Sequence, residues 1–146
     1  MPTDNARQHI DVAADLDTVL ATIRDVGSQP DWIPTIKEAE VDETDSSGLP
    51  RTARFAASTA VGTDRYTLAY EHSPGGMGWS MVEGRLQTGQ EGRYTLERLD
   101  DGATRVTYDL TIHHNLPLPG FLRSRVIKGL VDETLKGLRS RLEGAG

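Results

Sequence analysis

The chain has 146 residues, a formal net charge of −6 and an isoelectric point near 5.1, and it contains no cysteine. This length fits a single domain over residues 1–146 that is large enough to bury a core. The acidic balance argues against nucleic acid as a partner, because binding phosphates requires an excess of Lys and Arg. The lack of cysteine excludes disulfides, thiol nucleophiles and thiolate metal sites.

The first 35 residues predict one strand followed by helical structure. Residues 7–12 are a short strand candidate. The next segment has the apolar spacing of one helical face, with Asp15 or Asp17 as the N-cap and Gly27 at its end. The face is formed by Leu16, Val19, Leu20 and Ile23. A second short helix is expected to begin at Pro30.

From residue 35 the period of the apolar pattern changes to two, which is typical of strands. Turn residues such as Gly, Asp, Asn and Pro separate the alternating segments. Six strands are predicted, at residues 35–44, 51–61, 65–72, 77–84, 92–99 and 104–113. Consecutive strands with tight connections form an antiparallel sheet, so the chain is expected to fold as α+β.

After Pro119 and Gly120 the apolar period returns to that of a helix, predicted over 120–142. Gly129 and Gly137 each cost roughly 1 kcal/mol relative to alanine, a cost often offset where a helix packs closely. The apolar stripe comprises Leu122, Val126, Ile127, Leu130, Val131, Thr134, Leu135, Leu138 and Leu142. This helix is the natural cover for the apolar face of the sheet, and a pocket is expected between them.

An ordered set of segments resembles a known family. The set comprises QPDWIPTIKEAEV, Y-x-L-x-Y, GW, G-x-Y-x-L, T-x-V-T-Y-x-L and PLPGFLR, spread over residues 7–143. It is similar to the polyketide cyclase/dehydrase and lipid-transport family of the START-like (SRPBCC) superfamily, in particular its small bacterial members. The resemblance implies the helix-grip (START/Bet v 1-like) fold. In that fold a seven-stranded curved antiparallel sheet surrounds a long C-terminal helix, and two short helices lie between the first two strands.

The resemblance leaves three functions open, because fold does not fix function. The first is binding or carriage of a hydrophobic small molecule, a lipid or polyketide-like compound, between the sheet and the C-terminal helix. The second is a cyclase or aromatase that uses Tyr and His groups in the same cavity. The third is a protein-interaction module of the stress or toxin–antitoxin kind. The family offers no universal catalytic motif, so no catalytic residue is assigned and carriage is favoured over catalysis.

The expected ligand contacts come from the alternating apolar face and the helix that covers it. Four tyrosine hydroxyls on this face need partners when buried, which suits a mostly apolar ligand with a few oxygens. A packed core is the alternative for each residue. The candidates are Trp32, Phe55, Tyr66, Leu68, Tyr70, Trp79, Met81, Tyr94, Leu96, Tyr108, Leu110, His114, Val126, Ile127 and Leu130.

The histidine pair divides between the two faces of its strand. His113 and His114 are adjacent, so their side chains point in opposite directions. By parity His114 follows Ile112 to the inner face, where it contacts a ligand, transfers a proton or ends the strand. His113 is expected to be solvated. The four histidines have no metal-ligand spacing, so we expect no metal and no cofactor.

Some residues keep two interpretations at this stage. Trp32 either seats the short helix against the sheet or forms a gate at the pocket entrance. Glu83 shares the parity of Trp79 and has some prospect of partial burial. The basic residues Arg123, Arg125 and Lys128 are either solvated or meet an anionic head group.

The sequence also bears on location. The N-terminal residues carry no charged segment followed by an apolar stretch, so we expect no secretory signal. No run of about 18 apolar residues occurs, so we expect no membrane span. A cytoplasmic protein is predicted, and its oligomeric state stays open.

Overall fold

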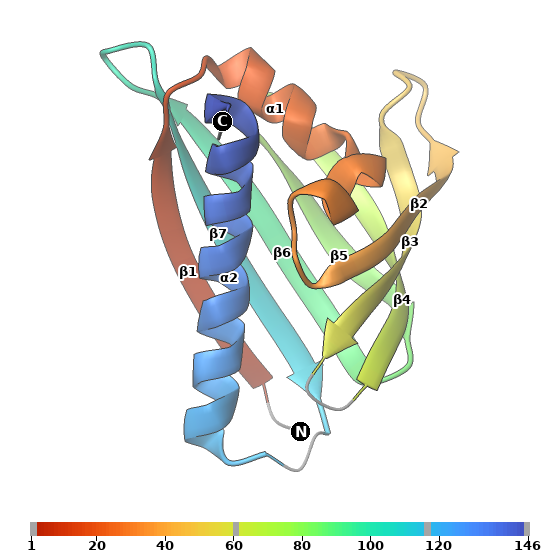
Figure 1. Cartoon of the computed structure of the whole chain (residues 1–146). Coiled ribbons are helices and arrows are strands. Elements are labelled where there is room, and N and C mark those ends of the chain that lie inside the picture. The colour runs from red at the N-terminus through yellow and green to blue at the C-terminus, as the bar shows by residue number, and fades with distance from the viewer. Residues whose placement is uncertain (1–2, 60–61, 116–117, 145–146) are drawn as a thin grey trace.

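A computed structural model describes residues 3–59, 62–115 and 118–144. Within these residues the elements are two α-helices, one 3₁₀-helix (η1) and seven strands (Figure 1). They follow the chain as β1 (Thr3–Val12), α1 (Leu16–Arg24), η1 (Val26–Asp31), β2 (Ile36–Thr44), β3 (Pro50–Thr59), β4 (Gly62–Ser73), β5 (Gly76–Gly84), β6 (Gln87–Arg98), β7 (Thr104–His114) and α2 (Gly120–Glu143).

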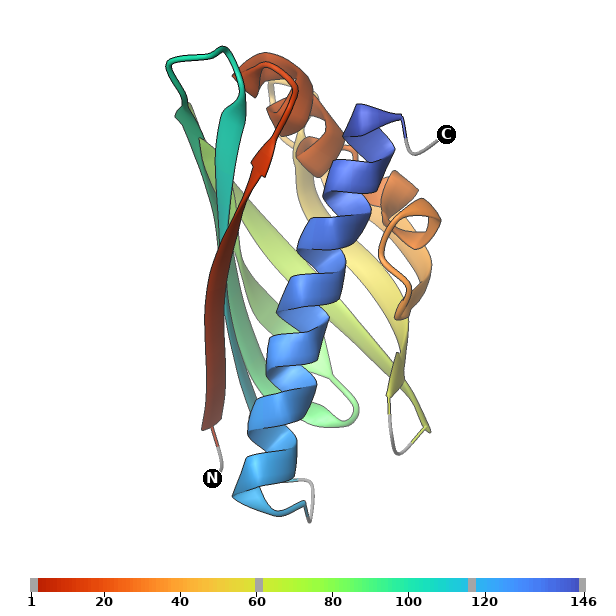
Figure 2. The same ribbon diagram turned by 60° about the vertical axis from the view of Figure 1, so that its left-hand side comes forward.

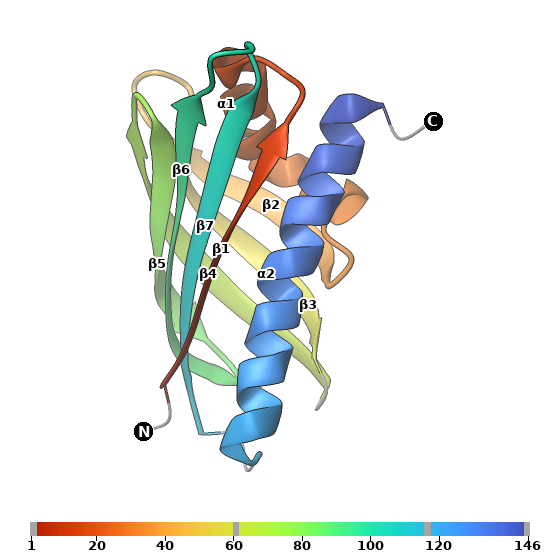
Figure 3. The same cartoon turned by 90° about the vertical axis from the view of Figure 1, so that its left-hand side faces the viewer.

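The strands form one antiparallel sheet in the order β1-β7-β6-β5-β4-β3-β2. Only β1 joins out of sequence, beside β7. The sheet curves around α2, which runs along its inner face, as Figures 2 and 3 show from two further directions. Helix α2 contacts β1 and β7, while η1 contacts β2. The predicted α+β class and the helix-grip arrangement are confirmed.

The helices between β1 and β2 differ from the prediction in detail. Of the two N-cap candidates for α1, Asp15 is the cap, because its carboxylate accepts hydrogen bonds from the backbone N–H and the hydroxyl of Thr18. The second helix is a 3₁₀-helix that begins at Val26, so Pro30 lies inside it and does not start it. Gly27 therefore belongs to η1, and α1 ends earlier, at Arg24.

All seven predicted strands are present, and β1, β4 and β6 begin three or more residues before their patterns indicated; β4 begins at Gly62, opposite Thr59 of β3. β1 begins at Thr3, because its first residues pair with the end of β7, where Thr3 lies opposite His113. β6 begins at Gln87 for the same reason, since Gln87 lies opposite His114. Hydrogen bonding to β7 therefore sets where β1 and β6 begin, because the side chains at these two ends are too polar to show the apolar alternation of a strand. Val61, predicted as a strand residue, lies outside the described residues.

A bulge in β5 corrects the prediction for Glu83. Thr67 of β4 lies opposite Glu83, but the next residue, Leu68, lies opposite Met81. Val82 is thus an extra residue in β5, and such an insertion reverses the side-chain parity beyond it. Glu83 is exposed for this reason and is not partly buried, as parity with Trp79 had indicated.

One end of the space between sheet and helices is a packed core. It includes fully buried residues from strands and from all three helices: Val12, Val19, Ile23, Val26, Met77, Val106, Val131 and Leu138. Gly137 allows α2 to approach η1 closely, since an added Cβ would overlap the backbone carbonyl of Trp32. The close contact that offsets the cost of this glycine is therefore with the end of η1.

Candidate functional site

The other end of the same space is hollow. A cavity of about 520 Å³ lies between the sheet and α2, within the roughly 300–1,000 Å³ that is usual for small-molecule sites. Its wall combines strand residues with the inner face of α2 and part of η1. The alternating face predicted from the sequence is therefore packed at one end and open at the other.

Most of the predicted contact residues line this cavity. They are Phe55, Tyr66, Leu68, Tyr70, Trp79, Tyr94, Tyr108, Leu110, His114, Val126, Ile127 and Leu130. Trp32, Met81 and Leu96 do not line it. Trp32 is buried at the end of η1, where its indole N–H donates to the Ser28 hydroxyl over 3.3 Å, a position that favours the seating role over the gate. Leu96 is buried in the core, and Met81 lies beside the bulge in β5.

The aromatic rings of the wall form a continuous cluster. Trp79 is central, with its ring centroid 6.0 Å from that of Tyr70 and 5.8 Å from that of Tyr108. Tyr108 stacks on Tyr94 at 4.7 Å. Gly92, opposite Trp79 on β6, leaves room for the indole, since an added Cβ would overlap the ring. Each ring packs against its neighbours, so the rings of the aromatic wall fix one another's positions.

Three phenol groups of this wall have no hydrogen-bond partner among the described residues. No hydrogen bond joins the hydroxyls of Tyr66, Tyr94 or Tyr108 to any other residue in the part of the chain that the structure describes, although each of these residues is at least 92% buried. Burial raises the pKa of each of these phenols far above the ordinary value for tyrosine. They therefore remain protonated at neutral pH and can donate a hydrogen bond to an oxygen placed in the cavity.

A chain of hydrogen bonds joins polar side chains of the wall. The Trp79 indole N–H donates to Gln90 Oε1 over 2.9 Å, and the Gln90 amide donates to Gln87 Oε1 over 2.8 Å. The Gln87 amide donates to Asp64 Oδ2 over 2.9 Å, and the backbone N–H of Leu86 donates to Asp64 Oδ1 over 2.8 Å. The chain crosses from β6 to the first residues of β4 and ends on a carboxylate.

The sequence analysis missed Asp64, Gln87 and Gln90. Asp64 was assigned to a turn, yet it shares the parity of Tyr66, and this signal could have placed it on the inner face. The glutamines fell before the predicted start of the strand at 92–99, the fifth of the alternating run. Only their pairing with β7 shows that they belong to β6.

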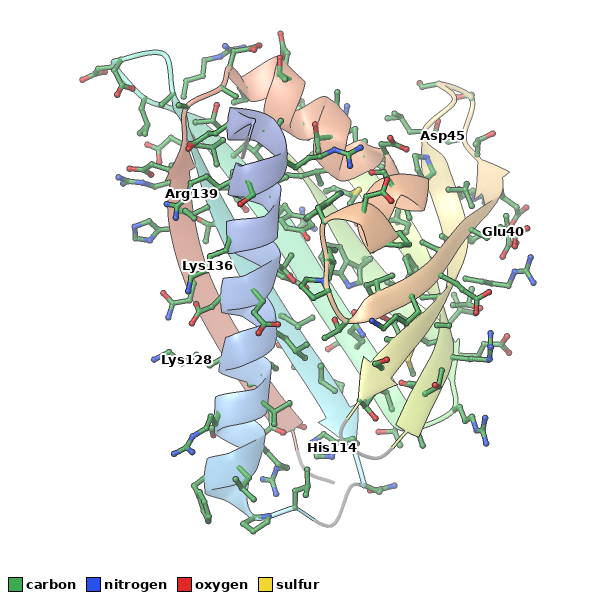
Figure 4. All side chains as sticks on the ribbon, viewed as in Figure 1. Glu40, Asp45, His114, Lys128, Lys136 and Arg139 are labelled. Carbon is green, nitrogen blue, oxygen red and sulfur yellow. The ribbon has the colours of Figure 1, made fainter. Side chains whose placement is uncertain are left out.

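A second polar group contains His114. Its Nε2 lies 2.7 Å from Asp4 Oδ2, and the Nε of Arg123 donates to both carboxylate oxygens of Asp4 over 3.2 and 3.3 Å. Arg123 also donates to the Leu118 carbonyl over 2.9 Å. All three side chains of this group line the cavity. Figure 4 shows His114 at the end of the sheet that faces the first turns of α2.

His113 has the opposite environment, as its parity predicted. It is only partly buried, and it is not simply solvated: Nδ1 lies 2.9 Å from the Thr3 hydroxyl and Nε2 lies 2.9 Å from Glu91 Oε1. The two histidines therefore belong to different faces and cannot act together.

Two classes of site can be checked directly. Within residues 3–59, 62–115 and 118–144, no group of three or more His, Cys, Asp or Glu side chains is arranged to hold a metal ion. Among the helices described there, none has the length and hydropathy needed to cross a bilayer.

A curved antiparallel sheet that grips a long C-terminal helix over an apolar cavity defines the START-like class. Residues 3–143 match the family described as polyketide cyclase/dehydrase and lipid transport, and the chain belongs to this family. The resemblance drawn from its sequence segments is thereby confirmed. No curated protein sequence matches the chain.

Solved structures show the same fold. A START superfamily protein from Mycobacterium smegmatis is 22% identical with a TM-score of 0.88, covering 97% of this chain and 99% of that one. The Zhui aromatase/cyclase from Streptomyces sp. R1128 is 15% identical with a TM-score of 0.80, covering 97% and 94%. The protein TTHA0849 from Thermus thermophilus is 20% identical with a TM-score of 0.78, covering 99% of each chain. At these identities the likeness concerns the fold.

Proposed function

We propose that this protein binds a hydrophobic small molecule, a lipid or a polyketide-like compound, in the cavity between the sheet and α2. The observation that carries the proposal is the cavity itself, about 520 Å³ in volume and walled largely by aromatic and aliphatic side chains. The family description names lipid transport and polyketide cyclisation, and both kinds of activity use an apolar molecule.

The physical basis of binding is burial of apolar surface. Each square ångström of apolar surface removed from water contributes roughly 25 cal/mol before the costs of association. The aromatic cluster holds one wall in place, so little ordering is needed when a ligand enters. The phenols of Tyr66, Tyr94 and Tyr108, which have no hydrogen-bond partner among the described residues, would donate hydrogen bonds to ligand oxygens, and this favours a mostly hydrocarbon or aromatic molecule with a few oxygens.

The proposal predicts that the protein retains a ligand from a lipid-rich cell extract. Native mass spectrometry after incubation is expected to show a discrete adduct, which denaturation releases for identification. Leu130→Arg should abolish the adduct, because Leu130 lines the cavity and an arginine there would fill it with a charged side chain. Ser140→Arg is the matched control, since it adds the same charge to an exposed position of α2 away from the cavity.

Two results would contradict carriage. A clean mass for the folded wild-type protein at every extract concentration would mean that the cavity retains no ligand. An adduct that survives in Leu130→Arg would place the bound molecule elsewhere. Circular dichroism of both variants establishes that the comparison is between folded proteins.

A cyclase or aromatase activity is the second candidate, and polar groups within the cavity favour it. Asp4, His114 and Arg123 meet at one wall, where an imidazole and a carboxylate could move a proton. Solved aromatase/cyclases share the fold. Mass and chromatographic retention together separate the two candidates. A polyketone that is loaded into the protein and released with water lost, or at the same mass but with a new retention time, indicates cyclisation, whereas release with both unchanged indicates carriage.

An interaction module would need exposed apolar residues. Two occur near the start of α2, where Phe121 is 69% and Val126 is 48% exposed. Val126 also lines the cavity, and the two exposed apolar residues outside its wall, Phe121 of α2 and Val82 of β5 (62% exposed), come from different elements. We therefore favour ligand binding over an interaction role.

A further inference from the structure

The stacked pair of Tyr94 and Tyr108 indicates which chemical group the ligand carries, and this inference rests on the proposed binding function. Tyr94 of β6 and Tyr108 of β7 lie directly opposite each other in the sheet. Their rings stack with centroids 4.7 Å apart and planes inclined at 29°. Because opposed residues on one face of a sheet extend side by side, the two hydroxyls lie at neighbouring places in the cavity wall.

Both hydroxyls lack a partner and are within reach of a ligand. Neither forms a hydrogen bond with another residue in the part of the chain that the structure describes. The buried side-chain nitrogen and oxygen atoms there that have neither a partner nor accessible surface are Arg24 Nε and His72 Nδ1. The two phenol oxygens are not among them, so both keep accessible surface, and this surface faces the cavity that the two buried residues line.

A neighbouring side chain fixes this pair in place. The Trp79 ring packs against both phenol rings, with its centroid 5.3 Å from that of Tyr94 and 5.8 Å from that of Tyr108. The Trp79 indole N–H in turn donates to Gln90 Oε1 over 2.9 Å. The positions of the two hydroxyls are therefore set before a ligand arrives, and binding there requires little ordering of side chains.

The pair stays uncharged and offers two donors. Burial, and after it the nearness of Tyr70, raises the pKa of the Tyr94 phenol. Burial, and after it the nearness of Tyr94 and Tyr66, raises the pKa of the Tyr108 phenol. Both groups therefore keep their protons at neutral pH. A buried O–H without an acceptor is costly, so the pair lacks a group that accepts hydrogen bonds.

The rest of the wall favours an acceptor without charge. Six charged or titratable side chains also line the cavity: Asp4, Asp64, His114, Arg123, Arg125 and Glu133. Asp4 is paired with two basic side chains, the Asp64 side chain is enclosed, and Arg125 and Glu133 are exposed on α2. No Lys, Arg or His among the described residues shifts the pKa of either phenol of the pair. No cation is therefore close enough to balance an anion placed there.

We propose that Tyr94 and Tyr108 together bind an uncharged carbonyl oxygen of the ligand, such as that of a ketone, ester or quinone. A carbonyl oxygen has two lone pairs and no proton, so it can accept from both phenols and brings no donor that needs a further partner. An alcohol brings such a donor, and a hydrocarbon leaves both phenols without a partner. The pair therefore orients the ligand and favours carbonyl compounds among apolar molecules of the same shape.

The test compares two volatile probes of the same shape, 2-nonanone and 2-methylnon-1-ene, in which a CH₂ group replaces the carbonyl oxygen. Headspace gas chromatography above the protein solution gives both dissociation constants. Tyr94→Phe and Tyr108→Phe each remove one donor and keep the ring. Each should weaken binding of the ketone by about two- to tenfold, the effect of one neutral hydrogen bond, and should not weaken binding of the alkene.

A carbon-13 label at the carbonyl reports the hydrogen bonds directly. The NMR signal of bound 2-nonanone should lie downfield of its position in cyclohexane, because hydrogen bonding withdraws electron density from the carbonyl carbon. Each of the two tyrosine variants should move the signal back upfield. Thr95→Val is the matched control: it removes a hydroxyl from an exposed residue of β6 outside the cavity wall, and it should change neither the signal nor the affinities. Circular dichroism verifies the fold of all three variants.

The outcomes separate this inference from the proposed function. If folded wild-type protein retains neither probe, the proposed binding function fails. If the alkene binds but the ketone does not, or the wild-type carbonyl signal lies at its cyclohexane position, ligand binding stands and the carbonyl inference is overturned. It is also overturned if the downfield signal and the ketone affinity persist in both tyrosine variants, since water or another wall group then holds the oxygen. The wild-type signal keeps the inference falsifiable if a variant does not fold.

Discussion

At the residue scale, two glycines of α2 that look alike in the sequence have different surroundings. Gly137 faces the carbonyl of Trp32 so closely that no side chain fits. Gly129 lies at the cavity, and an added Cβ would meet nothing within 4 Å. The close packing expected to offset the cost of a helical glycine therefore applies to Gly137 and not to Gly129.

The pair predicts opposite effects of the same substitution. Gly137→Ala should lower the free energy of unfolding by about 1–3 kcal/mol, the usual cost of overpacking. Gly129→Ala should raise it by about 0.5–1 kcal/mol, because alanine restricts the unfolded chain and favours helix. Urea denaturation of both variants measures the two changes, and shifts of the same sign would contradict the assigned contacts.

Single residues also show which parts of the cavity wall the sequence could not predict. The inward position of Tyr66, Trp79 and Tyr108 followed from alternation, since hydrophobic periodicity records which face is buried. Asp64 and the glutamines of β6 broke that pattern, because a polar residue on the inner face looks like a turn residue. Their burial depends on hydrogen bonds to one another, which no local pattern contains.

At the element scale, α2 performs two tasks along its length. Its C-terminal half closes the packed core, where Leu138 is fully buried. Its N-terminal half covers the cavity, where Leu130 is only partly buried. The sequence shows one continuous apolar stripe, because burial against a core and burial against a cavity require the same residue types.

This division predicts unequal costs for two leucines of one helix. Leu138→Ala should destabilise the protein by about 3 kcal/mol, since it opens a new void in close packing. Leu130→Ala should cost less than about 1.5 kcal/mol, because the space beside it is already empty and the site is partly solvated. Chemical denaturation curves give both values, and equal costs would indicate that the cavity closes in solution.

At the scale of the whole molecule, all four tyrosines of the sequence gather on one inner face. Burial raises the pKa of each, and for Tyr70 the side chain of Gln29 opposes part of the rise. A phenol whose pKa is higher in the folded than in the unfolded chain contributes stability that is fully present below the unfolded value of about 10. That contribution is lost as the pH rises above it.

Alkaline titration is therefore expected to couple ionisation to unfolding. The native protein should show no tyrosinate absorbance near pH 10, where the protein in denaturant titrates freely, and the signal should appear together with loss of circular dichroism. A reversible tyrosinate signal from folded protein near pH 10 would show that at least one phenol is open to solvent.

The sequence by itself determined the order of elements, the α+β class, the inner face of most strands and most of the aromatic cavity wall. These follow from periodicity and turn chemistry, which act over a few residues and are written in local order. Tertiary structure decided the rest. Pairing with β7 set the starts of β1 and β6, the bulge at Val82 turned Glu83 outward, and the packing of three helices on a curved sheet filled one end of the interior and left the other hollow. Such outcomes depend on residues far apart in the chain, so no single stretch of sequence contains them.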